Sequence, residues 1–220
     1  MIRNGNIERN YPSVDDGTAT GVCLDHTIRY QLASSYTEGK KVLDAAAGVG
    51  YSSTILKARK YFGYDISPEA VTYGQKYYAK PGVSFELQDL DSLSRLTVDP
   101  EKRVDVVVSF ETIEHLQDPE SFLSWTLNMA DTILVSTPIA LPGKYGMHSP
   151  YHTVEWYAQE FIDLCQSKAD VYNNTVSGES GKFSIKYFWE FDDGPAYITD
   201  LDLNNLPANG VIISVFSKTV

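Results

Sequence analysis

The chain has 220 residues, which is enough for one domain, residues 1–220, with a substantial core. Its 43% hydrophobic and 12% aromatic residues exclude a disordered chain, and a formal net charge of −11 argues against broad binding to nucleic-acid backbones. No apolar run reaches the length of a membrane span, and residues 1–10 contain no secretory signal. The cysteines, Cys23 and Cys165, match no metal-binding spacing. We therefore expect a cytoplasmic protein with free thiols.

Beyond a loose polar lead-in, the hydrophobic pattern predicts helices and strands in regular alternation. A helix is expected at 25–36, a strand at 41–44 and a second helix at 51–58. The next expected elements are strand 61–66, helix 68–79, strand 83–87, strand 104–110, helix 119–130, strand 132–136 and helix 154–165.

Toward the end of the chain the pattern is weaker. Two final strands are expected at 169–176 and 211–216, and an aromatic, acidic insertion at 183–203 separates them without an evident role. The alternation as a whole predicts an α/β fold. We expect a doubly wound, mainly parallel, seven-stranded sheet with helices on both faces.

The stretch V-L-D-A-A-A-G-V-G-Y-S-S, residues 42–53, predicts a strand that ends in an acid and turns through small residues into a helix. Gly48 and Gly50 allow the backbone to approach a ligand, and a nucleotide-like cofactor binds at this turn in parallel sheets. Asp44 would repel a pyrophosphate but suits an ammonium and a sulfonium, which favours S-adenosylmethionine. The nicotinamide fingerprint has a further glycine where this chain has Ser53. A purely structural glycine turn is the alternative.

Acidic residues recur where the parallel strands end. Asp44, Asp65 and Asp89 end the first three strands, and Glu111 follows the fourth, so all are expected at one edge of the sheet. Asp65 is expected to bind both ribose hydroxyls, a role that a nicotinamide enzyme would share. Asp89 is expected to bind the adenine amine, with the Leu90 amide near the ring, although a helix N-cap explains Asp89 equally well.

Six stretches carry a resemblance to a known family: VLDAAAGVGYSS, GYDISPEAV, FELQDLDSL, DVVVSFETIEHLQDPESFL, LVSTP and YHTVEWYAQEF. Over roughly residues 25–165 the chain resembles class I S-adenosylmethionine-dependent methyltransferases. It is most similar to a subgroup found beside glycosyltransferases in polysaccharide loci, in which a DHTIRY-like helix precedes the first strand. The resemblance implies a Rossmann-like methyltransferase domain with a lead-in at 1–24, a cofactor-binding core at 25–136 and an acceptor-side part at 137–220.

The resemblance also implies a set of cofactor-binding residues. These are Asp44, Gly48, Gly50, Asp65, Asp89 and the backbone of Ser109 and Phe110, to which we add Ala45, Ile66 and Leu90. Arg29 is a candidate partner for the methionine carboxylate, with a surface ion pair as the alternative.

The chemistry is expected to involve histidine. The chain contains four histidines: His26, His115, His148 and His152. Three of them follow the fourth and fifth strands, where the methyl acceptor would sit. Methyl transfer requires in-line alignment and, for some acceptors, removal of a proton. His115 or His152 is the candidate base, oriented by Glu111 or Glu114; alternatively, Glu114 and His115 only shape the loop.

A metal site is a further possibility that the sequence leaves open. Glu111, Glu114 and His115 have the spacing of one helical face, and His152 completes a set that could hold a divalent ion. The pattern E-x-x-E-H followed by H-x-x-E-W resembles metal-dependent small-RNA terminal ribose methyltransferases. Because the acidic surface disfavours RNA, we keep this reading as an alternative and do not favour a metal.

The predicted function is methyl transfer from S-adenosylmethionine to an oxygen, in preference to a nitrogen, of a small molecule or saccharide. The prediction of the acceptor rests on the resemblance and on four aromatic side chains that could stack on a sugar or could belong to the core: Tyr145, Tyr151, Trp156 and Trp189. Besides the RNA enzyme, the alternatives are a non-catalytic cofactor-binding module and a nicotinamide oxidoreductase.

Overall fold

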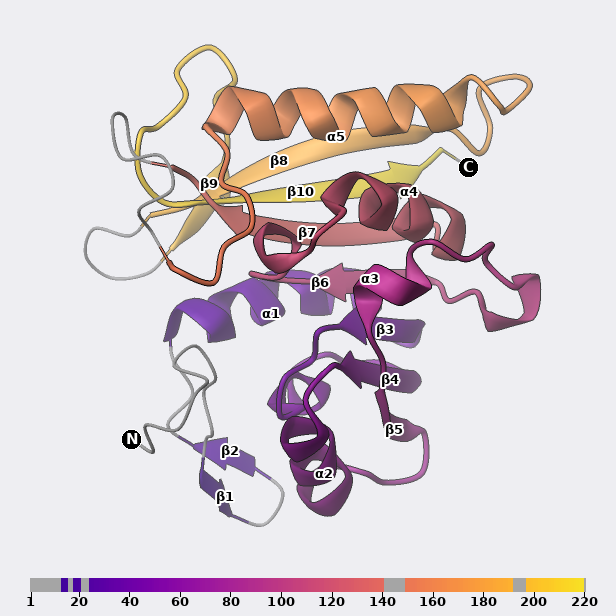
Figure 1. Ribbon diagram of the computed structural model, residues 1–220, viewed down its shortest axis with the longest axis vertical. Coiled ribbons are helices and arrows are strands. Elements are labelled where there is room, and N and C mark those ends of the chain that lie inside the picture. Colours follow the sequence, from indigo (N-terminus) through magenta and orange to yellow (C-terminus); the bar gives the residue numbers. More distant parts are fainter. Residues whose placement is uncertain (1–12, 16–17, 21–23, 141–148, 192–196, 220) are drawn as a thin grey trace.

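A mixed eight-stranded sheet forms the centre of the computed structural model, which describes residues 13–15, 18–20, 24–140, 149–191 and 197–219 (Figure 1). The strands are β3 (Lys41–Ala45), β4 (Lys60–Asp65), β5 (Val83–Leu87), β6 (Val106–Ser109), β7 (Thr132–Pro138), β8 (Phe183–Glu190), β9 (Ile198–Asp200) and β10 (Val211–Lys218). Their order is β5-β4-β3-β6-β7-β10-β8-β9. The first five are parallel, and β10, β8 and β9 continue the sheet antiparallel.

Helices cover both faces of this sheet, as the alternation predicts. They are α1 (Leu24–Thr37), η1 (Tyr51–Thr54), α2 (Pro68–Tyr77), α3 (Leu90–Leu93), η2 (Pro100–Lys102), η3 (Ile113–His115), α4 (Pro119–Met129) and α5 (Ala158–Asn173). One core joins α1 and α2 to the sheet through residues such as Tyr30 and Val71. The opposite core joins α4 and α5 through residues such as Phe122 and Phe161. The doubly wound α/β architecture is therefore confirmed.

The starts of α2 and α4 follow from their local sequence. Ser67 and Asp118 cap the two helices by accepting hydrogen bonds from backbone amides of the first turn, and Pro68 and Pro119 occupy the first helical position. A proline at that position loses no helical hydrogen bond, because the first amides have no partner within the helix. These helices begin as predicted.

Two predictions about the sheet were wrong: that it has seven strands, and that residues 169–176 form one of them. Residues up to Asn173 belong to α5, because Phe161, Cys165 and Ala169 recur every four residues and are fully buried on one helix face. The strand partner of β10 is instead β8, in the stretch interpreted as an insertion. It pairs with β10 over its full length, from Phe183 opposite Lys218 to Glu190 opposite Val211.

Two further expectations need correction. The helix expected at 51–58 is only the short turn η1, because the following backbone runs back along the start of β3: Gly39 N donates to Lys57 O (2.9 Å) and Arg59 N to Lys40 O (2.8 Å). The loose lead-in contains a hairpin of β1 (Ser13–Asp15) and β2 (Thr18–Thr20).

Two other predictions concern membranes and thiols. Across the described residues, no helix combines the length and the apolar character that crossing a bilayer requires. Cys165 is a free, buried thiol whose pKa burial raises to about 12, whereas Cys23 lies outside the described residues. Cys165 is therefore a core residue of α5.

Candidate functional site

A pocket of about 690 Å³ opens beyond the carboxyl ends of β3, β4 and β6. The loops after these strands line it together with α1, α3 and residues 149–152. In the strand order, β3 and β6 are neighbours from which the chain winds in opposite directions, and ligands bind at such a switch point. The predicted gathering of strand-end residues at one edge is therefore present.

The glycine turn after β3 carries two glycines with different tasks. Gly48 lines the pocket with φ +57°, and a Cβ on it would meet no atom within 4 Å. A Cβ on Gly50 (φ +87°) would lie 2.2 Å from the Phe85 ring. Gly48 therefore serves the open approach to the pocket, and Gly50 serves packing beneath it. Ala46, also in the turn, adopts φ +67° without being glycine.

Asp44 lies fully buried under this turn, behind the pocket lining. Its Oδ2 accepts hydrogen bonds from Ser52 Oγ (2.5 Å) and Tyr61 OH (2.9 Å). Burial raises the pKa of Asp44 to about 6, against the lowering effect of these hydrogen bonds. A carboxylate in such a low-dielectric position acts on a nearby cation through its field and needs no direct contact.

Asp65 lines the pocket and also holds the turn in shape. Its Oδ2 accepts from Gly48 N (2.9 Å) and its Oδ1 from Ser67 N (2.8 Å). Ile66, next to it, lines the pocket with 63% of its surface exposed, and Leu90 lines it from α3. This combination of a carboxylate, the exposed side chain of Ile66 and the buried side chain of Leu90 suits a ribose and a flat base.

Asp89 both lines the pocket and caps α3. Its side chain accepts from Asp91 N (3.0 Å) and Ser92 Oγ (2.7 Å), and the Ser92 hydrogen bond lowers the pKa of Asp89. Both roles considered from the sequence are thus compatible at this position. Phe110 lines the pocket after β6, whereas Ala45 and Ser109 are fully buried behind the lining.

Arg29 lies outside the pocket lining, although its helix neighbours His26 and Tyr30 line it. Its guanidinium lies 3.6 Å from a carboxylate oxygen of Glu111 and 3.4 Å from one of Glu190. The ion pair considered from the sequence is present, but it is buried. Contact of Arg29 with a methionine carboxylate stays a prediction.

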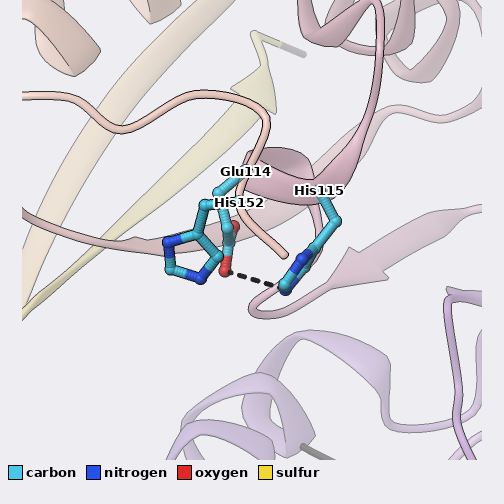
Figure 2. Close-up of side chains that lie close together, drawn as sticks. All are labelled: Glu114, His115 and His152. Atoms are coloured by element: carbon cyan, nitrogen blue, oxygen red, sulfur yellow. Dashed lines mark ion pairs between the residues drawn. The ribbon is translucent and has the colours of Figure 1, made fainter. Parts of the chain in front are cut away.

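The opposite side of the pocket is lined by residues of η3 and of the segment 149–152. Figure 2 shows three side chains from these segments, Glu114, His115 and His152. Glu114 is buried, and Thr137 Oγ1 donates to its carboxylate (3.1 Å). Burial, reinforced by the Glu111 charge, raises the pKa of Glu114 well above its ordinary value. His115 Nε2 lies 3.8 Å from Glu114 Oε1, the ion pair drawn in Figure 2.

His152 joins this group from the other segment. Ligand-capable atoms of Glu114, His115 and His152 lie within 4.8 Å of one another, and the centroids of the two imidazole rings are 4.9 Å apart. His152 Nδ1 lies 3.1 Å from Glu155 Oε1. Glu111 does not belong to this group, so the predicted set of four is reduced to three among the described residues.

Sequence reasoning missed the residues that bring the two segments together. Thr153 N and Oγ1 both donate to the Glu114 carbonyl (2.8 and 3.0 Å), and the hydroxyl also lies 2.5 Å from Leu116 O. The H-x-x-E spacing in the sequence could have indicated Glu155, but no pattern marks Thr153.

The aromatic candidates separate into two groups. Tyr151 lines the pocket and is 47% exposed, whereas Trp156 and Trp189 are core residues. Tyr145 and His148 lie outside the described residues. Tyr151 is thus the described aromatic candidate that can meet an acceptor.

Comparison with known proteins identifies the chain. A family model described as a methyltransferase domain matches residues 36–193. The chain belongs to this family. S-adenosylmethionine is therefore its cofactor, as the turn after β3 predicts, and the nicotinamide alternative is set aside.

Individual relatives agree with the family. The methyltransferase is 31% identical over 150 residues to a probable S-adenosylmethionine-dependent methyltransferase of Mycolicibacterium smegmatis, covering 64% of this chain and 56% of the relative. A Mycobacterium tuberculosis protein of the same description is 31% identical over 147 residues, covering 63% and 52%. The chain thus spans about half the length of the curated relatives it matches.

Among solved structures, the methyltransferase domain of a bacterial Hen1 protein superposes with a TM-score of 0.61 at 18% identity, covering 89% of this chain and all of that one. At this identity the likeness shows the fold, which is that of the class I enzymes, with eight strands in a mixed sheet.

Proposed function

We propose that this methyltransferase transfers the methyl group of S-adenosylmethionine to an oxygen, in preference to a nitrogen, of a small molecule or saccharide. One observation carries the proposal: a single pocket is lined both by six of the predicted cofactor residues and by the group of Glu114, His115 and His152. The six are Gly48, Asp65, Ile66, Asp89, Leu90 and Phe110. The cofactor and an acceptor can therefore meet in the same cavity.

The residues divide the work along the pocket. Gly48 and Asp65 would hold the ribose, Ile66 and Leu90 would hold the base, and the buried Asp44 carboxylate would contribute a negative field that favours the sulfonium. S-adenosylmethionine supplies a methyl group on a positively charged sulfur. His152 or His115 accepts the proton of the acceptor hydroxyl as its oxygen bonds the methyl carbon and the carbon–sulfur bond breaks.

The saccharide part of the proposal rests on Tyr151 and on sequence similarity to methyltransferases of polysaccharide loci. An exposed tyrosine ring at the pocket rim offers an apolar face on which a sugar ring can stack. Hydroxyl groups of the sugar would then face the histidines. The net charge of −11 favours such a neutral acceptor over a polyanion.

The test is single-turnover transfer of a radiolabelled methyl group to a panel of methyl glycosides, nucleotide sugars, catechols, primary amines and short RNAs. We expect label on a hydroxylated small molecule or sugar, and loss of turnover with unchanged cofactor affinity in His152→Ala. If the protein binds S-adenosylhomocysteine but labels no member of the panel, it is a cofactor-binding module instead.

A second candidate function is supported by the close approach of one carboxylate and two imidazoles. Glu114, His115 and His152 suit a divalent transition metal, and such an ion would coordinate the hydroxyl pair of a terminal ribose in RNA. Calorimetry with Mn²⁺ on the wild-type protein and on His115→Ala decides whether the group binds metal. Methylation of short RNA that disappears with EDTA and returns with Mn²⁺ would favour this candidate over the first.

A further inference from the structure

Arg29 is a buried cation that lies outside the pocket lining but beside Glu111, which lines the pocket. It is 3% exposed, and it projects from α1 into the space between the loop after β6 and the end of β8. Two carboxylates from those elements, Glu111 and Glu190, share its guanidinium. A buried charge needs such partners, because its desolvation is otherwise uncompensated.

Among these three residues, Glu111 alone lines the pocket. It adopts φ +50°, a conformation that costs a non-glycine residue about 1 kcal/mol or more and persists where the surroundings enforce it. Ser136 helps to hold Glu111 in this conformation: its Oγ accepts a hydrogen bond from Glu111 N (3.1 Å) and donates one to Glu111 Oε1 (2.8 Å). Arg29 also holds Glu111, through an ion pair with the same carboxylate oxygen.

We propose that Arg29 is a positioning residue for methyl transfer: it fixes the Glu111 carboxylate toward the acceptor, and Glu190 fixes Arg29. This rests on the proposed function. A carboxylate held in one place accepts a hydrogen bond from the acceptor and orients its oxygen for in-line attack, and a misplacement of about 1 Å can reduce the rate about 100-fold.

The charges in this cluster also bear on the cofactor. The guanidinium already lies within ion-pair distance of two carboxylates, which oppose the approach of a third carboxylate. The positioning role therefore predicts that Arg29 does not hold the methionine carboxylate of S-adenosylmethionine and that its substitution leaves cofactor affinity intact.

The first experiment compares the wild-type protein with Arg29→Met by calorimetry, using S-adenosylhomocysteine and 5′-methylthioadenosine, which lacks the carboxylate. We expect both affinities to stay within about threefold of wild type. A loss of tenfold or more for S-adenosylhomocysteine alone would show that Arg29 binds the carboxylate and would overturn the proposal. Failure of the wild-type protein to bind either compound would instead contradict the proposed function.

The second experiment measures turnover on the panel member that the wild-type protein methylates fastest. Arg29→Met is expected to lower kcat about 100-fold with little change in KM for S-adenosylmethionine. Because Arg29 acts through Glu111, the double variant Arg29→Met/Glu111→Gln is expected to be no slower than Glu111→Gln alone. If the kcat losses of the two single variants multiply in the double variant, the proposal is overturned.

Stability and structure provide readouts that need no acceptor. Arg29→Met removes the cation beside the buried Glu190 carboxylate and the partly exposed Glu111 carboxylate, so Arg29→Met/Glu190→Gln is the variant to crystallise if the single variant does not fold. We expect the Glu111 carboxylate to leave Ser136 and its φ to become negative. An unmoved Glu111 in that crystal structure would contradict the positioning role.

Discussion

At the scale of single residues, Asp44 shows how the site and the stability of the fold are coupled. Burial raises its pKa to about 6 in the folded protein, against 3.8 for an ordinary aspartate. The folded state therefore retains a proton that the unfolded state loses, and stability falls as the pH rises from about 4 to about 6. The difference corresponds to about 3 kcal/mol of lost stability at neutral pH.

Asp44→Asn should reveal this cost. At pH 7.5 and without cofactor, we expect the variant to be at least as stable as wild type in urea unfolding, because the ionisation penalty is removed. At pH 4 the advantage should disappear, and affinity for S-adenosylmethionine should fall at pH 7.5. The exposed residue Glu38 gives a control, Glu38→Gln, which should change neither quantity. A variant that is less stable by the same amount at both pH values would contradict this account.

The two glycines of the turn give a matched pair of variants. Gly50→Ala drives a Cβ into the Phe85 ring and should cost about 3 kcal/mol or more of unfolding free energy. Gly48→Ala meets no atom within 4 Å, so it should cost only about 1–2 kcal/mol for its left-handed backbone. Chemical denaturation measures the unfolding free energy of both variants. Equal losses would mean that the contact with Phe85 adds nothing to the cost of Gly50→Ala.

Asp65 is the residue on which the ribose assignment depends. Asp65→Ala should weaken binding of S-adenosylhomocysteine more than tenfold, on the order of 1.4 kcal/mol or more, in calorimetry. Since Asp65 also accepts from the Gly48 and Ser67 amides, Asp65→Asn serves as the variant that retains one oxygen acceptor. An unchanged affinity in Asp65→Ala would refute the assignment.

At the scale of elements, the site depends on docking residues 149–155 against η3. Thr153 makes this junction through the Glu114 and Leu116 carbonyls. Thr153→Val keeps the side-chain shape but removes the hydroxyl, so His152 should move away from Glu114 and turnover should fall about tenfold or more with unchanged cofactor affinity. Thr175→Val, which removes an exposed hydroxyl at the end of α5, is the control. Normal turnover in Thr153→Val would show that the hydrogen bonds of the Thr153 hydroxyl are not needed for methyl transfer.

Elements whose signals are local could be predicted from the sequence. An N-cap residue followed by proline identifies the starts of α2 and α4, and continuous apolar runs identify β6 and β7. β8 was missed because its acidic and aromatic surroundings hide a strand whose partner, β10, lies far along the chain. Long-range pairing of this kind leaves no local pattern.

The same distinction applies within the site. Asp65 and Asp89 were predicted because each ends an expected strand, and His115 and His152 because they follow strands; all four line the pocket. The contacts of Arg29 with Glu111 and Glu190 join residues more than 80 and 160 positions apart, beyond the reach of any spacing rule.

At the scale of the whole molecule, the sheet has a parallel half that carries the cofactor turn and an antiparallel half that ends in β9 (Figure 1). The strand β10 lies between β7 and β8, although it comes after both in the chain. Until residues 211–218 are available, β7 and β8 each have an unsatisfied edge toward one another.

This order has a consequence for biosynthesis. On the ribosome, β3, β4, β5 and β6 have all of their strand partners once β7 has emerged, whereas the second edge of β7 waits for β10. Glu190, at the end of β8, reaches Arg29 only when β10 closes the gap. A nascent chain that lacks β10 therefore lacks the strand that joins β8 and Glu190 to the rest of the sheet, and we expect stalled translation products to be inactive in methyl transfer.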